Sequence, residues 1–168
     1  MLRSARRFGL IAVILGVTLG LGATLAAQAA DPFLGNWELN VEKSEFNSQG
    51  AAVRSRTLEI ARKGTVFSHV QQTYRVGQDA VQRLAYDVAY DGKDSTTVVG
   101  GAFDVVTFSR AGNVLTRKAK NRGTEVETAT YTVSADGKTL TIVTKGNNYG
   151  VEYGSTQVFE KAAAAAAR

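Results

Sequence analysis

Residues 124–144 read TEVETATYTVSADGKTLTIVT and carry the clearest structural signal in the chain. Two segments rich in Thr, Val, Tyr and Ile, which pack well on a pleated surface, flank Asp136-Gly137. An Asp-Gly pair favours the positive-φ turn that joins antiparallel strands. After the turn, Leu140 and Ile142 alternate with threonines. The stretch therefore predicts a β-hairpin with one face packed in a core.

The same pattern of β-rich segments and glycine-containing turns continues through the rest of the chain. Its even spacing favours an all-β fold, an antiparallel up-and-down β-barrel of about 8 to 10 strands. A β-sandwich is the alternative. Only Val41–Asn47 is a candidate for a helical turn. The predicted strands are Trp37–Val41, Val53–Ala61, Thr65–Val76, Ala80–Tyr90, Thr96–Val99, Phe103–Arg110, Val114–Lys120, Thr124–Val133, Lys138–Thr144 and Val151–Glu160.

Composition excludes several functional classes. The 168 residues have room for one domain. The net charge is +5, but three arginines lie in the first seven residues, which leaves 17 basic residues against 15 acidic ones. This balance is not typical of a nucleic-acid-binding surface. The chain has no Cys and one His, so no disulfide framework, thiolate nucleophile, metal site or cofactor is predicted.

The N-terminus is typical of an exported protein. Residues 1–7 are basic, residues 8–27 are apolar, and Ala27-Gln28-Ala29 has the small residues of a cleavage site. We therefore predict a signal peptide over residues 1–29 and export to the periplasm or the medium. An uncleaved anchor is the alternative, and it is the only membrane contact expected. Residues 30–161 form the predicted barrel domain, and residues 162–168 an alanine-rich tail.

A resemblance to a known family supports this fold. The residues Gly35-Asn36-Trp37 open the first strand, and GNWELNVEKSEF follows the start of certain exported bacterial lipocalin-like proteins of the calycin superfamily. Later segments match in the same order: YDGKD at 90–94, SADGKTLT at 134–141, TKGN at 144–147 and VFEK at 158–161. The resemblance implies a lipocalin-like barrel closed at one end by the tryptophan. It implies no specific activity.

The last strand departs from a pattern found in fatty-acid-binding relatives. There an Arg-x-Tyr sequence clamps a carboxylate inside the barrel, whereas this chain has Gln157-Val158-Phe159. The resemblance therefore does not extend to that clamp. Lipocalins also often place a basic side chain on the opening tryptophan, and Lys161 is the nearest cation to the last strand.

Candidate ligand-binding residues follow from the barrel and the resemblance together. Trp37 either closes the barrel or stacks on a ligand, and Gln157 and Phe159 occupy the clamp positions. Tyr86 and Tyr90, with Tyr149 and Tyr153, line a mouth or cavity, or belong to an aromatic core. His69 faces the barrel interior or solvent. It has no nucleophile or orienting acid at a suitable spacing, so no catalytic residue is predicted.

Charged residues on two predicted strands leave further alternatives open. Arg54, Arg56 and Arg62 share a face with apolar residues, which indicates either a solvent-facing wall with a slipped register or a basic mouth for anions. Glu125 and Glu127 share a strand face and are predicted to form a solvated acidic strip paired with lysines on the neighbouring strand.

We predict from these features that the protein binds a small, mostly apolar molecule non-covalently inside the barrel. This prediction rests on analogy of fold. The alternative is a barrel filled by its own side chains that acts as a protein-interaction or inhibitor module of the cell envelope. Neither interpretation requires an enzyme, and the sequence leaves the ligand and the oligomeric state open.

Overall fold

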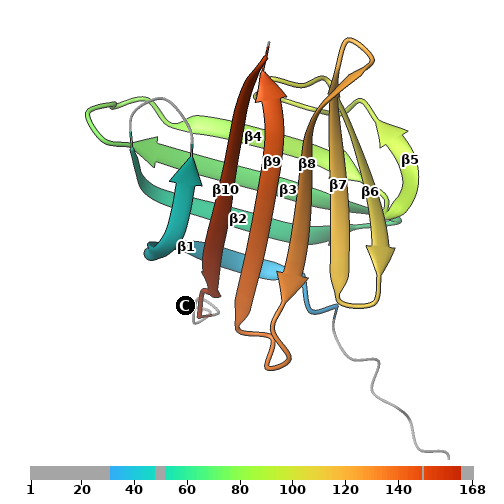
Figure 1. Ribbon diagram of the computed structural model, residues 1–168. Helices are drawn as coiled ribbons and strands as arrows, with labels where there is room; N and C mark the ends of the chain where they lie inside the picture. Colours follow the sequence, from blue (N-terminus) through green and yellow to red (C-terminus); the bar gives the residue numbers. More distant parts are fainter. Residues whose placement is uncertain (1–30, 48–51, 149, 164–168) are drawn as a thin grey trace, which may run out of the picture.

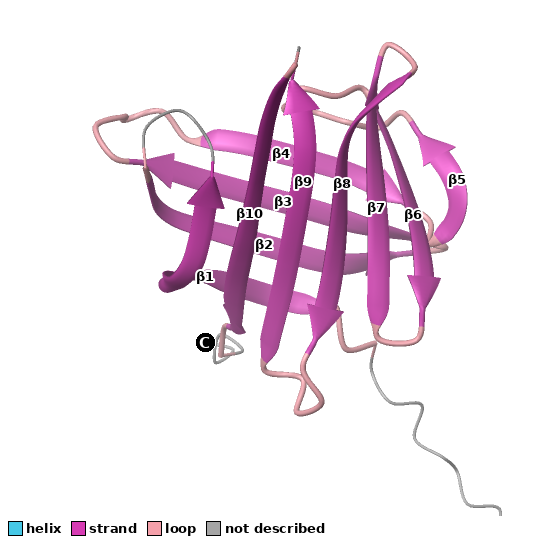
Figure 2. Ribbon diagram, viewed as in Figure 1, coloured by secondary structure: helices cyan, strands magenta, loops and turns pink. Residues whose placement is uncertain are grey.

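The computed structural model describes residues 31–47, 52–148 and 150–163, which form ten antiparallel strands and, within these ranges, no helix (Figures 1 and 2). No helix that is long and apolar enough to cross a membrane is therefore found in this part of the chain. The predicted signal segment and tail residues 164–168 lie outside it. The strands are β1 (Gly35–Asn47), β2 (Val53–Lys63), β3 (Val66–Arg75), β4 (Gln82–Val88), β5 (Asp91–Ser95), β6 (Val105–Ala111), β7 (Val114–Asn121), β8 (Thr124–Val133), β9 (Thr139–Asn148) and β10 (Val151–Lys161).

The strands form one sheet that curls into a nearly closed barrel. Its order is β4-β3-β2-β1-β10-β9-β8-β7-β6-β5, so consecutive strands pair except β4 and β5, which are the two ends of the sheet, and β1 joins the last strand. Strands β2 to β4 cross behind β7 to β10 at a steep angle (Figure 1). The two sheet ends meet at the bridge between Ala85 and Val99, whose backbone N–H groups donate to each other's carbonyl at 2.9 and 2.8 Å. The Ser95 hydroxyl of β5 also donates to the Asp87 carbonyl of β4 at 2.6 Å. The predicted up-and-down barrel is confirmed.

Strand β1 corrects the sequence interpretation of Val41–Asn47. The expected helical turn is wrong, because the strand continues to Asn47 after a register shift against β10 between Asn40 and Glu45. Within the shift, the Ser44 hydroxyl donates to the Asn40 carbonyl at 2.6 Å and accepts the backbone N–H of Val158 at 3.0 Å. The Ser44 side chain thus replaces a backbone hydrogen bond between β1 and β10, and regular pairing of the two strands resumes at Glu45.

Strand β5 also differs from the prediction. It spans Asp91–Ser95, whereas Thr96–Val99 was the predicted strand. The polar residues of β5 find backbone partners on β6, with Asp94 opposite Thr107. The β-branched residues that follow lie instead against the edge of β4, where only Val99 forms a bridge. Pairing partners, rather than β-propensity, decide this boundary.

A hydrophobic core fills the end of the barrel where β1 begins and β10 ends. Trp37 is fully buried there, as predicted, and its indole N–H donates to the Phe33 carbonyl at 3.0 Å. Leu140 and Ile142 are also buried, which confirms the inward face of the hairpin. The Lys161 Nζ lies 4.9 Å from the centre of the Trp37 ring. Lys161 therefore provides the basic residue against the tryptophan.

Candidate ligand-binding cavity

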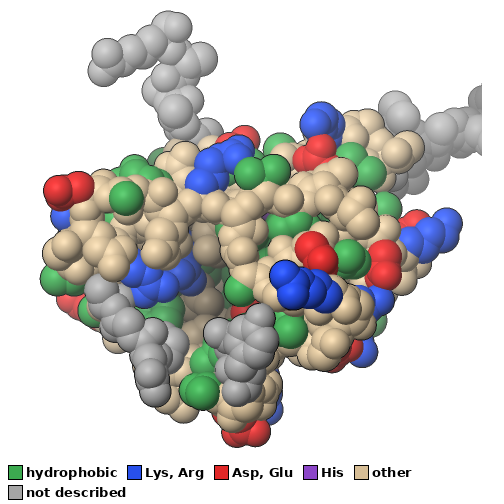
Figure 3. Space-filling model, turned by 90° about the horizontal axis from the view of Figure 1, so that it is seen from above, with side chains coloured by type: hydrophobic (Ala, Val, Ile, Leu, Met, Phe, Trp, Pro, Cys, Tyr) green, Lys and Arg blue, Asp and Glu red, His purple; other side chains and the backbone are tan. Residues whose placement is uncertain are grey.

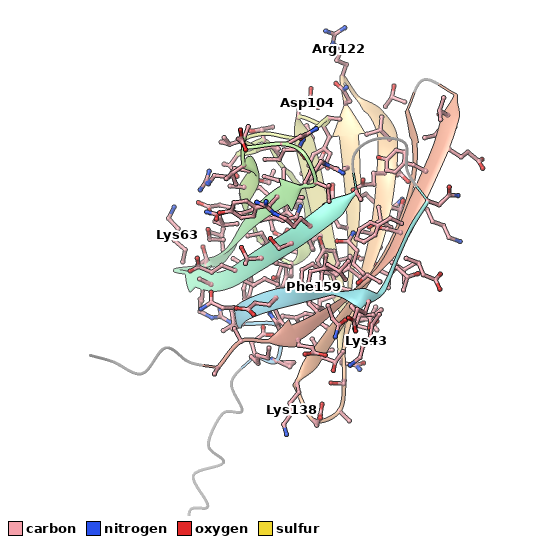
Figure 4. All side chains as sticks on the ribbon, turned by 90° about the vertical axis from the view of Figure 1, so that its left-hand side faces the viewer. Lys43, Lys63, Asp104, Arg122, Lys138 and Phe159 are labelled. Atoms are coloured by element: carbon pink, nitrogen blue, oxygen red, sulfur yellow. The ribbon has the colours of Figure 1, made fainter. Side chains whose placement is uncertain are left out.

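Polarity increases along the barrel interior from the closed end to the mouth. At the closed end, Phe159, Leu140 and Val133 form one cross-strand row, and Phe159 points inward in Figure 4. Successive rows toward the mouth place Gln157 beside Ile142, then Ser155 beside Thr144, then Tyr153 beside Gly146. On β7 and β8, Arg117 and Glu127 lie in the last two of these rows. The apolar half is therefore filled, and polar groups line the other half.

Two adjoining cavities occupy the polar half. The larger is about 570 Å³ and the smaller about 220 Å³. Both are bordered by Arg56, Arg75, Glu127 and Tyr153. Seen from above, the surface is hollowed, and Lys or Arg side chains border the hollow (Figure 3). Further lining residues are Gln71, Leu84 and Phe103 in both cavities, Thr73, Gln82 and Arg83 in the larger, and Phe46, Val53, Arg117, Thr144, Ser155 and Gln157 in the smaller.

Arg117 is the most buried charged group of this site. Its side chain is 8% exposed, and one terminal nitrogen forms an ion pair with Glu127. The other donates to the hydroxyls of Tyr86 and Tyr131 at 3.3 and 3.2 Å. Burial alone lowers the pKa of Arg117, but the two tyrosines more than offset this and the pKa is raised, so the guanidinium stays charged. Its Nε has no hydrogen-bond partner among the described residues.

Glu127 receives a second hydrogen bond through an unusual contact on β9. The Tyr153 hydroxyl donates to Glu127 at 2.9 Å. The Tyr153 ring lies across Gly146, where an added Cβ would come within 2.3 Å of it. Glycine is thus required for the tyrosine to span β9.

The predicted acidic strip is correct for only one of its two glutamates. Glu125 is exposed and lies 3.1 Å from the Lys118 Nζ, as expected. Glu127 is not solvated, because a register shift between β7 and β8 at Ala119/Lys120 separates the two positions. An extra residue on β8 turns the strand locally, which places one carboxylate outside and the other inside.

Arg56 and Arg75 bring positive charge to the opposite wall. Arg56 Nε donates to Thr73 Oγ1 at 2.8 Å, and its NH1 hydrogen-bonds to Gln157 Oε1. Arg75 Nε donates to Gln82 Oε1 at 2.9 Å. Burial, and then repulsion from Arg75 and Arg117, lowers the pKa of Arg56 to about 10 although Tyr131 opposes it. Arg56 therefore remains charged at neutral pH, but in crowded positive surroundings.

Of the three arginines that alternation groups on one face of β2, Arg56 lines the two cavities, whereas Arg54 and Arg62 do not. A bulge between Val53 and Ser55 changes the phase of β2, so Val53 is buried and Arg54 is exposed. The Arg54 guanidinium carbon lies 5.8 Å from the Tyr74 ring centre. The corresponding carbon of Arg62 lies 4.6 Å from the Phe67 ring centre. Sequence alternation alone had grouped these three arginines on one face.

The other predicted site residues divide between cavity and core. Gln157 lines the smaller cavity, and its amide donates to Ser155 Oγ at 2.9 Å. Trp37 and Phe159 lie in the closed end and line neither cavity. The Tyr86 hydroxyl accepts from Arg117 below the cavity. Tyr90 packs in the core, stacked on Phe67 with ring centres 3.9 Å apart, and Tyr149 lies outside the described residues.

His69 faces the interior and is 1% exposed. Its Nε2 lies 2.8 Å from the Tyr90 hydroxyl, and its ring centre lies 5.0 Å from that of Phe108 and 5.1 Å from that of Tyr86. Burial, reinforced by Arg117, lowers the pKa of His69 to about 3, so the ring is neutral. Across residues 31–47, 52–148 and 150–163, no three His, Asp or Glu side chains meet as metal ligands do.

Sequence reasoning missed Arg75 and Arg117. A signal for Arg117 is present in the predicted strand Val114–Lys120, because Arg117 lies two residues from Leu115 and two from Ala119. Strict alternation places Arg117 on the same face as these two apolar residues. Arg75 continues the inward series of Phe67 and His69 in the same way.

Comparison with known proteins identifies the fold and goes no further. No family model and no curated protein matches the sequence. Among solved structures, the zebrafish ileal bile acid-binding protein complexed with cholic acid is 18% identical, with a TM-score of 0.51 over 78% of this chain and 99% of that chain. A point mutant of the fluorescent protein UnaG is 15% identical, with a TM-score of 0.53 over 79% of this chain and 97% of that one. The chain therefore shares the antiparallel β-barrel fold of these proteins.

Proposed function

We propose that the protein binds a small amphipathic anion in the open half of its barrel. The observation that carries this proposal is the cavity of about 570 Å³ and its charge. Arg56, Arg75 and Arg117 are buried or half-buried around the two cavities, and Glu127 is the acidic residue that lines them. Partly desolvated positive charges in a concave site attract and orient an anion.

The polarity of the cavity modifies the mostly apolar ligand expected from the sequence. The apolar side chains pack on one another in the closed half, with Phe108 and Leu115 fully buried. Leu84, Phe103 and Phe46 remain at the cavity wall for an apolar part of the ligand. The structural neighbour that was solved with cholic acid supports a small molecule in a barrel of this kind.

The cavity favours this proposal over the filled-barrel interaction module. That alternative requires large side chains at every interior position. Here two cavities remain open between Arg56 and Arg75 on one wall and Glu127 and Tyr153 on the other. This space can take a ligand.

We propose further that the protein is exported and acts by binding alone. Residues 1–29 support export, and fusion of this segment to a reporter enzyme, with cell fractionation, tests it. The surroundings of His69 support a non-catalytic role, because its ring contacts aromatic side chains and lines neither cavity.

A fluorescence titration with 8-anilinonaphthalene-1-sulfonate tests ligand binding. This probe combines an aromatic body with a single sulfonate. We expect saturable binding by the folded protein and a loss of about tenfold or more in affinity for Arg56→Gln, which removes a charge-assisted hydrogen bond. Arg54→Gln is the matched control on the same strand, and its affinity should stay within about twofold. Equal affinities for both variants, or no saturable binding, would overturn the proposal.

A further inference from the structure

The two cavities contain more positive charge than one monovalent ligand balances. Four arginines line them, of which Arg83 is exposed to solvent. The other three are buried or half-buried, and Glu127 supplies one negative charge. The interior excess is therefore two positive charges.

We infer that the head group bound in this cavity is a dianion of the phosphate monoester class. The inference rests on the proposed function and deepens it by naming the charge of the ligand. A sulfonate or carboxylate leaves one excess charge in a partly desolvated site, whereas a phosphate monoester balances both. Such a group carries a charge close to −2 above its second pKa of about 6.

The positions of Arg56 and Arg75 suit one tetrahedral group. Arg56 is directly opposite Thr73 in the β2–β3 ladder, and Arg75 lies two residues further along β3. Diagonal neighbours in a sheet have Cβ atoms about 7 to 8 Å apart or slightly less, within reach of long side chains. Both arginines line both cavities. Two guanidinium groups can therefore approach one phosphate from neighbouring strands.

Glu127 does not serve as the counter-charge for this wall. One of its carboxylate oxygens pairs with Arg117, and the other accepts from Tyr153. On the opposite side, the hydrogen bonds to Thr73 and Gln157 hold the Arg56 guanidinium in place. Burial, and then repulsion from Arg75 and Arg117, lowers the pKa of Arg56, and an anion that enters between the walls relieves the repulsion.

Hexyl phosphate and hexyl sulfate form a matched pair of probes. They share the same chain and a tetrahedral head group, but at pH 8.0 the phosphate is a dianion and the sulfate a monoanion. We expect isothermal titration calorimetry to show binding of hexyl phosphate at least tenfold tighter at pH 8.0. At pH 5.0, where the phosphate ester is mostly a monoanion, this ratio should fall to about two or less. The sulfate corrects for pH effects on the protein itself.

Two variants test whether Arg75 is responsible for the preference for hexyl phosphate over hexyl sulfate. Arg75→Gln should reduce the phosphate-to-sulfate ratio at pH 8.0 to about two or less, while Arg54→Gln should leave it unchanged. The comparison of the two pH values on the unmodified protein needs no variant, so it decides the inference even where Arg75→Gln fails to fold. Inorganic phosphate, titrated in the same way, separates two sources of the dianion. If it binds more weakly than hexyl phosphate, the site recognises a phosphate ester. If it binds equally well, the site recognises free phosphate, and the assignment to a monoester is wrong.

The possible failures are distinguishable. Equal affinities for hexyl phosphate and hexyl sulfate at pH 8.0 overturn the dianion inference and leave anion binding in place. Absence of binding by both compounds and by the anilinonaphthalene probe overturns the proposed function as well. A phosphate-to-sulfate ratio that persists at pH 5.0 also contradicts the inference, because charge then does not explain the preference.

Discussion

Replacing His69 by Gln should remove most of the acid sensitivity of folding between pH 7 and pH 5. His69 is buried among aromatic rings, and its pKa falls from an ordinary 6.5 to about 3. In the unfolded chain the imidazole takes up a proton below pH 6.5, whereas in the folded protein it stays neutral. The contribution of His69 to the free energy of unfolding is therefore fully present above pH 6.5 and decreases as the pH falls. The decrease ends near pH 3, where the folded protein also takes up a proton at this residue.

The size of the effect follows from this difference in pKa. A fall in pKa from 6.5 to about 3 corresponds to about 5 kcal/mol over the whole pH range. Between pH 7 and pH 5, protonation of the unfolded histidine alone costs about 2 kcal/mol. Asp87, whose pKa is lowered chiefly by a hydrogen bond from Lys63, affects stability below this window. The interval from pH 7 to 5 therefore isolates the histidine.

Urea unfolding at these two pH values measures the effect. The single tryptophan, Trp37, is fully buried and reports unfolding by fluorescence. We expect the unmodified protein to lose about 2 kcal/mol from pH 7 to pH 5, and His69→Gln to lose less than about 0.5 kcal/mol. Gln78→His adds a histidine at an exposed turn and should behave as the unmodified protein does. An equal loss in His69→Gln would refute the reasoning.

Three further substitutions, studied by urea unfolding at pH 7, test the contacts that Glu127, Gly146 and Tyr153 make beside the cavities. Glu127→Gln leaves the buried Arg117 charge without its carboxylate partner and should lower the free energy of unfolding by about 3 to 5 kcal/mol. The exposed Glu125→Gln should lower it by less than about 1 kcal/mol. Similar losses in the two variants would argue against a buried ion pair. Gly146→Ala places a Cβ 2.3 Å from the Tyr153 ring and should cost about 1 to 3 kcal/mol, and an unchanged midpoint would contradict that contact. Tyr153→Phe removes one hydrogen bond to Glu127 and should lower the free energy of unfolding by about 1 kcal/mol. A gain in stability would contradict this expectation.

Local sequence patterns are sufficient to predict most of the strands, and the resemblance adds the closed end of the barrel. Short-range alternation and turn residues are sufficient for a hairpin such as the one around Asp136-Gly137, because side chains in a strand alternate between faces. The position of Trp37 at the closed end is what the resemblance of the first strand to lipocalin-like proteins implied. Its burial against Phe33 and Lys161 agrees with the expected role of closing the barrel.

Which charged residues enter the cavity depends on how distant strands pair in the folded protein. Side chains point alternately to the two faces of a strand, and one extra residue in a bulge moves the side chains beyond it to the opposite face. The bulge beside Arg54 places Arg56 inside and Arg54 outside, and the shift on β8 does the same for Glu127 and Glu125. These shifts depend on the register with a neighbouring strand, which is a long-range property of the fold. The composition of the barrel wall follows from local sequence, whereas the charge of the site is set by how the strands pair.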